Sequence, residues 1–160
     1  MNKSKVESSH NIVYQWNDKK YLTHKNFRKL LKQFGDLLPD PLSERVDLEE
    51  YVDKWLKFAD ILLAFDKDKV IGIRVLYAND MENKCAHGLL LSILPEYQGR
   101  GIGRKMYNLS INLAKNRGMT KFFLFVHYEN RIAIKLYKSL GFVEIERNLT
   151  IIRMRLDIVK

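Results

Sequence analysis

Apolar and polar residues follow two different periods along this chain, and their order predicts both strands and helices. Runs of strand type occur at residues 12–16, 61–65, 70–77, 85–94, 121–126, 142–145 and 149–158. Apolar residues at helical spacing predict helices at 24–34, around 48–55, around 102–113 and at 130–140. This order of elements predicts an α/β fold with a mixed sheet.

Capping and breaking residues mark the ends of the N-terminal helices. Thr23 is suited to cap the first helix, and Gly35 is suited to stop it. Pro39 and Pro41 prevent its continuation, because proline restricts the backbone and lacks an N–H donor. Asp47, three residues before a glutamate, gives the pattern of a capping box for the second helix.

The middle of the chain reads as a hairpin followed by a buried strand. Residues 66–69 are polar and connect two β-rich runs. The continuous apolar run 121–126 predicts a strand that is buried on both faces. We find no internal repeat and no linker, so we assign residues 1–160 to a single domain.

Length and composition indicate a globular protein. The 160 residues are 46% apolar and 29% charged, which excludes a disordered chain. The single cysteine, Cys85, excludes an intrachain disulfide, and we expect it to be a small buried residue in a strand. The sequence shows neither a secretory leader nor a run of about 18 apolar residues. We therefore expect a cytoplasmic protein with no membrane partner.

The charge narrows the class of partner. Lys and Arg number 28 against 19 Asp and Glu, which gives a net charge of +9. Such an excess favours a polyanion, whether nucleic acid, an anionic membrane or a phosphate-rich small molecule.

A glycine turn provides a candidate phosphate site. Gly99, Gly101 and Gly103 lie between a predicted strand and a predicted helix, where glycine allows consecutive N–H groups to point into one space. The N-terminus of the following helix adds unpaired N–H groups and a positive dipole end. Residues 98–126 contain six basic residues and no acidic one. The pattern therefore suits a pyrophosphate, although a plain tight turn would also use these glycines.

Two familiar nucleotide motifs do not fit this turn. A Walker loop needs Gly-Lys followed by Ser or Thr, but Gly103 is followed by Arg104 and Lys105. The dinucleotide fingerprint needs its third glycine where Arg104 stands.

Two linked motifs resemble those of the GNAT superfamily of N-acetyltransferases. The stretch 93–103 is similar to the family's acetyl-CoA signature through Gln98, Gly101 and Gly103. The stretch 130–142 is similar to the family's Asn-x-x-Ala-x-x-x-Tyr-x-x-x-Gly-Phe helix. The resemblance implies a GNAT-like α/β domain with a mixed, mostly antiparallel sheet. It would have six to seven strands and about four helices, and would splay at the cofactor cleft.

The resemblance also implies acetyl-CoA as the acetyl donor, with no metal. The backbone of Ile93 and Leu94 would pair with the pantetheine arm, and Asn130 would bond the cofactor from the far side. The N–H groups of the turn would hold the pyrophosphate. The implied cofactor-binding residues are Ile93, Leu94, Gln98, Gly99, Arg100, Gly101, Ile102, Gly103, Arg104, Asn130 and Tyr137.

For catalysis, the resemblance implies that Tyr137 is the general acid, because a phenol with a pKa of about 10 stays protonated at neutral pH. Its helical spacing also fits a core residue. The family's ribosomal-type members carry a glutamate where this chain has Phe125. The family's histone-acetylating members have a glutamate on the strand that leads into the glycine turn. The resemblance places His87 at that position, and His127 and Glu129 are further candidates for the base. A water relay is a further alternative.

The acceptor is expected to be an amine, in the first place a small metabolite or amino sugar and in the second a protein amine. The N-terminal helices and the loop 37–46, with Tyr51 and Trp55, would form its site. A module that only binds acetyl-CoA or RNA is the alternative class. No nucleic-acid motif accompanies the basic turn, so nucleic acid is not the expected partner. The oligomeric state stays open, a homodimer included.

Overall fold

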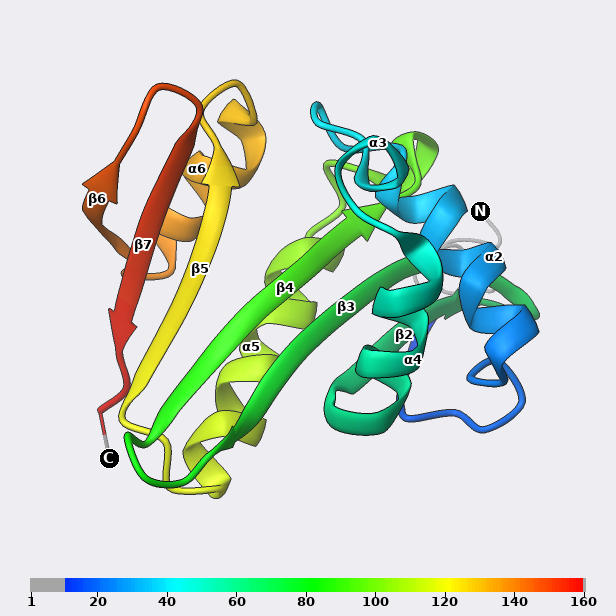
Figure 1. The fold of residues 1–160 in the computed structure, drawn as a ribbon, viewed down its shortest axis with the longest axis horizontal. Coiled ribbons are helices and arrows are strands. Elements are labelled where there is room, and N and C mark those ends of the chain that lie inside the picture. The colour runs from blue at the N-terminus through cyan, green and yellow to red at the C-terminus, as the bar shows by residue number, and fades with distance from the viewer. Residues whose placement is uncertain (1–10, 160) are drawn as a thin grey trace, which may run out of the picture.

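The computed structural model describes residues 11–159, which form one seven-stranded sheet flanked by helices (Figure 1). The strands follow the order β1-β2-β3-β4-β5-β7-β6. Their bounds are β1 Ile12–Trp16, β2 Asp60–Asp66, β3 Lys69–Asp80, β4 Cys85–Ile93, β5 Lys121–His127, β6 Val143–Arg147 and β7 Ile151–Asp157. The mixed sheet and its strand number confirm the prediction.

The helices are α2 His24–Gly35, α3 Leu42–Arg45, α4 Leu48–Phe58, α5 Ile102–Asn116 and α6 Arg131–Ser139, with a 3-10 turn at Pro95–Tyr97. Helices α2 and α4 cover one face of the β1–β4 half, and α5 packs on the opposite face (Figure 1). Within residues 11–159, no helix is long and apolar enough to cross a membrane.

The predicted caps form, with one change of partner. The Thr23 hydroxyl accepts a bond from the Asn26 amide at 3.2 Å. The Asp47 carboxylate accepts from the Glu49 amide at 3.0 Å, one residue before the glutamate of the predicted capping box. The short helix α3 was not predicted. It starts directly after Pro41, whose restricted φ of −56° suits the residue before a helix.

The sheet opens between its two halves. All strand pairs are antiparallel except β4 with β5, which run parallel and pair only from Cys85 with Lys121 to Gly88 with Leu124. Beyond Gly88 the two strands diverge (Figure 1). Leu89 is an extra residue in β4 at this point, because Gly88 pairs with Leu76 and Leu90 pairs with Val75. We call the space beyond Gly88, between β4 and β5, the fork.

The prediction that strand 121–126 is buried on both faces is wrong. Phe122, Leu124 and Val126 are buried under α5 and α6, whereas Phe125 is 65% exposed. Helices α2 and α4 cover the β1–β4 half and leave this face of β5 open (Figure 1). The apolar run 121–126 does not alternate with polar residues, so the sequence did not indicate that one face of this strand is exposed. Cys85 is buried in β4, as expected.

Candidate active site

The glycine turn has the backbone geometry that the sequence predicts. Gly99 and Gly101 have φ values of 78° and 79°, a region that glycine occupies without strain. A Cβ added at either one would meet no atom within 4 Å, so the space above the turn is open. Gly101 caps α5, and no side chain bonds to the N–H groups of that helix end. These donors are free to hold an anion.

Gly103 has a different role from the other two glycines. A Cβ on it would lie 3.3 Å from Ile93 Cδ1 and 3.3 Å from Leu136 Cδ2. It therefore allows α5 to pack closely against β4 and α6. The nearby arginines are partly engaged: Arg100 donates to the Glu96 carbonyl at 2.9 Å, and Arg104 donates to Ser139 Oγ at 2.7 Å.

The end of β4 offers one backbone donor to the fork. The Leu94 amide bonds to the Ile71 carbonyl at 3.0 Å, so by strand alternation the amide and carbonyl of Ile93 point away from β3. The Ile93 carbonyl accepts from Gln98 Nε2 at 3.1 Å. The Ile93 N–H is left facing the space that β5 has vacated.

Two cavities meet in the fork. The turn cavity, of about 500 Å³, is lined by the glycine turn, the end of β4 and α6. The fork cavity, of about 250 Å³, lies between β4, β5 and the loop 37–46. The residues common to both are Leu38, Pro39, Leu91, Asn130 and Tyr137. Of the predicted cofactor-binding residues, Leu94 and Arg100 line neither of these cavities.

Tyr137 is placed where the two cavities join, and its side chain is 6% exposed. Its ring packs against Tyr107 with a centroid separation of 5.0 Å and against Phe142 at 5.9 Å. Burial raises the pKa of Tyr137 above its usual value near 10, while the charge of Arg74 and the Tyr107 hydroxyl act in the opposite direction. The phenol is therefore protonated at neutral pH and is able to donate.

Asn130 lines both cavities from the start of α6. Its Oδ1 accepts from the Ala133 amide at 3.3 Å and caps the helix. The amide nitrogen is not used by this cap.

We predict that Asn130→Asp raises the KM for acetyl-CoA by about threefold to tenfold, because it keeps the cap but loses the donor. Steady-state kinetics with varied acetyl-CoA would measure this. Asn130→Ala should in addition lose about 1 kcal/mol of unfolding free energy with the cap. A wild-type KM in Asn130→Asp would contradict a role for the amide nitrogen.

The two histidines considered as general base, His87 and His127, differ in their position relative to the fork cavity. His87 lines neither cavity, and its ring stacks on Phe123 with centroids 5.7 Å apart. Burial lowers the pKa of His87, and Arg153 adds to the lowering while Asp80 opposes it. His127 does line the fork cavity. Its Nδ1 accepts from the Glu129 amide at 3.1 Å, so the neutral ring carries its proton on Nε2.

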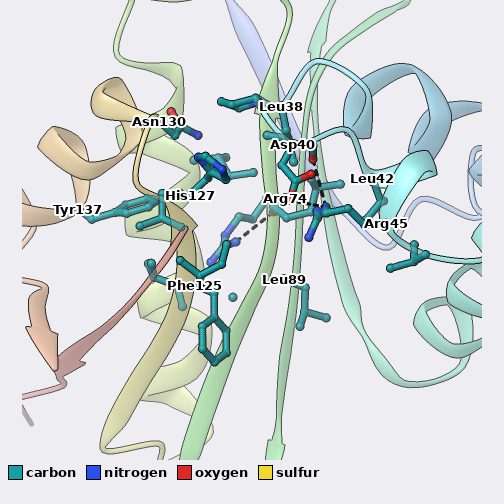
Figure 2. Close-up of a pocket in the computed structure, with 18 of the residues that line it drawn as sticks. Leu38, Asp40, Leu42, Arg45, Arg74, Leu89, Phe125, His127, Asn130 and Tyr137 are labelled. Carbon is teal, nitrogen blue, oxygen red and sulfur yellow. Dashed lines mark hydrogen bonds and ion pairs between the residues drawn. The ribbon is translucent and has the colours of Figure 1, made fainter. Parts of the chain in front are cut away.

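The acceptor side of the fork cavity combines aromatic rings with an ion pair. Tyr51 and Trp55 line it from α4, with ring centroids 5.3 Å apart. Asp40 and Arg45 form an ion pair at 3.3 Å across the loop (Figure 2). Phe125, at the position of the family's glutamate, lies on the rim. The loop 37–46, Tyr51 and Trp55 therefore line one cavity, and their role in binding the acceptor stays a prediction.

Among the fork-cavity residues that sequence reasoning missed are two with polar side chains, Arg74 and Tyr107. Both are buried, at 1% exposed each. A basic residue inside the apolar run 70–77 was the available signal for Arg74. Tyr107 carried no such signal, because it lies on the apolar face of a helix. Within residues 11–159, no cluster of His, Cys, Asp and Glu side chains could hold a metal ion.

Comparison with known sequences gives the family. The sequence model of the acetyltransferase (GNAT) family matches residues 24–142. N-alpha-acetyltransferase 30 of Schizosaccharomyces pombe is 28% identical over 127 residues, which are 78% of this chain and 83% of that protein. The mycothiol acetyltransferase of Renibacterium salmoninarum is 29% identical over 94 residues, 56% of this chain and 28% of that protein.

Solved structures share the fold. The ribosomal-protein-S18-alanine N-acetyltransferase of Escherichia coli superimposes on this protein with a TM-score of 0.73 and is 20% identical in sequence. The superposition covers 93% of this chain and 95% of the Escherichia coli chain. The paia N-acetyltransferase of Thermoplasma acidophilum, solved with coenzyme A, superimposes with a TM-score of 0.69 at 18% sequence identity. This superposition covers 92% of this chain and 99% of the Thermoplasma acidophilum chain.

The family model and the named relatives define the class of protein as an acetyl-CoA-dependent acyltransferase, and the open sheet with its glycine turn fits that class. The chain belongs to the acetyltransferase (GNAT) family, and the resemblance seen in its two motifs is confirmed.

Proposed function

We propose that this protein transfers the acetyl group of acetyl-CoA to the primary amine of a small acceptor, by direct attack inside the fork. The observation that carries the proposal is the meeting of the two cavities at Tyr137. The turn cavity would hold the pyrophosphate and pantetheine, and the fork cavity would hold the amine. The thioester would then lie beside the Tyr137 hydroxyl.

Three parts of the site would each have a separate chemical role. The Ile93 N–H would donate to the carbonyl oxygen as negative charge develops there, in the manner of an oxyanion hole. Tyr137 would give its proton to the sulfur as the acetyl group leaves. Gly99 and Gly101 leave room for the pyrophosphate on the N–H groups of the α5 N-terminus.

The small size of the fork cavity supports a small acceptor. Its volume of about 250 Å³ lies below that of typical ligand pockets, which run from about 300 to 1,000 Å³. A protein α-amine is the second candidate. It is supported by the alignment with an N-alpha-acetyltransferase over 78% of this chain.

A thiol-release assay with acetyl-CoA would test the proposal. The acceptors are small amines, amino sugars, peptides with a free N-terminus, and N-terminally blocked peptides containing lysine. We expect the highest kcat/KM with a small amine. A higher value for a free peptide N-terminus would assign the protein to the second candidate.

The pH dependence of kcat/KM tests which group is the general base, and His87 is the predicted base. A base must be neutral to act, so kcat/KM falls as the pH drops through its pKa. Burial lowers the pKa of His87, so this acidic limb should lie below about pH 6.5 and should vanish in His87→Gln. A proton would reach His87 from the cavity past Phe123 and Phe125, through water.

His127→Gln is the matched control for this experiment, because His127 lines the fork cavity itself. An acidic limb that vanishes only in His127→Gln would transfer the role to His127. A limb that persists in both variants would leave deprotonation of the amine to water.

A further inference from the structure

Arg74 is a buried cation without a counter-charge. It stands in β3 with 1% of its surface exposed. Within residues 11–159, no carboxylate forms an ion pair with it. A guanidinium buried away from water costs several kcal/mol of desolvation, which an ion pair would normally offset. Hydrophobic packing alone therefore does not account for a charged residue at this position.

The contacts of Arg74 hold its guanidinium in one place without neutralising it. Nε donates to Ser110 Oγ at 3.3 Å, and Nη1 donates to the Leu90 carbonyl at 3.0 Å and to the Val75 carbonyl at 3.4 Å. Nη2 is buried and has no hydrogen-bond partner among residues 11–159. Gly88 makes room for Nη2, since a Cβ there would lie 2.5 Å from it. All of these partners are neutral, so the full positive charge remains.

The guanidinium of Arg74 lies over the ring of Tyr107, which packs on the tyrosine at the junction of the cavities. The guanidinium carbon lies 4.3 Å from the centroid of the Tyr107 ring, and Tyr107 packs on Tyr137 at 5.0 Å. All three residues line the fork cavity, and Figure 2 shows the Arg74 side chain extending from β3 toward the side on which Tyr137 lies. Tyr107 thus stands between the cation and the candidate acid.

We propose that Arg74 is a positioning residue for acetyl transfer, which stabilises through Tyr107 the negative charge that Tyr137 acquires when it gives up its proton. The proposal rests on the proposed role of Tyr137. As the amine nitrogen bonds to the carbonyl carbon, the bond from that carbon to sulfur breaks. Tyr137 transfers its hydroxyl proton to the sulfur and keeps the electron pair as a phenolate. The proton lost by the amine returns to this phenolate through water.

The groups around Tyr137 agree with this direction. Burial raises the pKa of Tyr137, and Arg74 from β3 and Tyr107 from α5 counter that effect. From β5, His127 lines the same cavity, and on the loop Asp40 and Arg45 are paired with each other. Without Arg74, burial would leave the phenol a weaker acid.

The test uses Arg74→Met, which keeps an apolar chain of similar length and removes the charge. The pKa of Tyr137 is measured by NMR on protein labelled with ¹³C at tyrosine Cζ, with Tyr137→Phe as the assignment control. We expect this pKa to rise by about one unit and kcat to fall about tenfold, with an unchanged KM for acetyl-CoA. In a Tyr137→Phe background, Arg74→Met should cause no further loss of kcat.

If Arg74→Met lowers kcat but leaves the pKa of Tyr137 unchanged, the proposal is overturned and Arg74 is a structural residue. The proposal is also overturned if Arg74→Met lowers kcat by the same factor in the Tyr137→Phe background. Gly88→Ala is a second variant that retains the charge, because its methyl group displaces only the flexible end of Arg74. It should raise the pKa of Tyr137 by less than Arg74→Met does. If Tyr137→Phe itself works at full speed, the proposed acid is wrong, while the NMR shift still reports the coupling of Arg74 to Tyr137.

Discussion

Tyr137→Phe should lower kcat by about a hundredfold or more, with little change in the KM for acetyl-CoA. The substitution removes the proton donor at the junction of the two cavities and retains the ring that packs on Tyr107 and Phe142. Steady-state thiol release with a reactive acceptor would measure it.

Tyr107→Phe is the matched control. Tyr107 is the neighbouring buried tyrosine, and its ring packs equally closely, at 5.0 Å from Tyr137 and 5.7 Å from Phe142. We expect a smaller loss of kcat, because Tyr107 gives no proton to the sulfur, although its hydroxyl helps to offset the effect of burial on the pKa of Tyr137. A full-speed Tyr137→Phe protein would reject Tyr137 as the acid.

Gly101→Val should weaken acetyl-CoA binding by more than about tenfold, equivalent to about 1.4 kcal/mol. The added side chain would project into the open space above the turn, where we place the pyrophosphate. It would also force a branched residue into a φ of 79°, at a cost of about 1–2 kcal/mol in unfolding free energy. Calorimetry with coenzyme A, together with thermal unfolding, would separate the two effects.

Gly118→Val provides the control for that separation. Gly118 follows the other end of α5, has a φ of 82°, and its added Cβ would also meet nothing within 4 Å. The two substitutions should therefore destabilise the fold to a similar extent, and only Gly101→Val should reduce coenzyme A affinity. Equal affinities in the two variants would show that the turn does not hold the pyrophosphate.

The geometry that the sequence predicted for the glycine turn and for α6 depends on short-range rules. Gly99 and Gly101 adopt positive φ, a region that glycine occupies without strain, so the residue type made this turn possible. Asn130 and Tyr137 belong to one helix, so their spacing placed them on the same side of α6, where both line the turn cavity. The motif spacing also indicated the family.

The errors arose where a neighbour in space decides the outcome. Phe125 belongs to an apolar run, but it is exposed because α2 and α4 cover only the other half of the sheet. Counting along the sequence could not show that β4 still pairs with β5 at His87 and that its ring stacks on Phe123; its role as the base stays a prediction. Periodicity in one segment contains no information about which element covers it.

The sequence by itself determined the order of the elements, the glycine turn at the start of α5 and the tyrosine of α6, because each follows from local backbone preference and helical spacing. Only the tertiary structure showed that Gly88 is the residue beyond which β4 and β5 separate, since the position of the separation depends on strand pairing between distant segments. The same separation joins the two cavities at Tyr137 and brings Arg74 from β3 against Tyr107. The chemistry of the site therefore depends on contacts among β3, α5 and α6, whose residues are far apart along the chain.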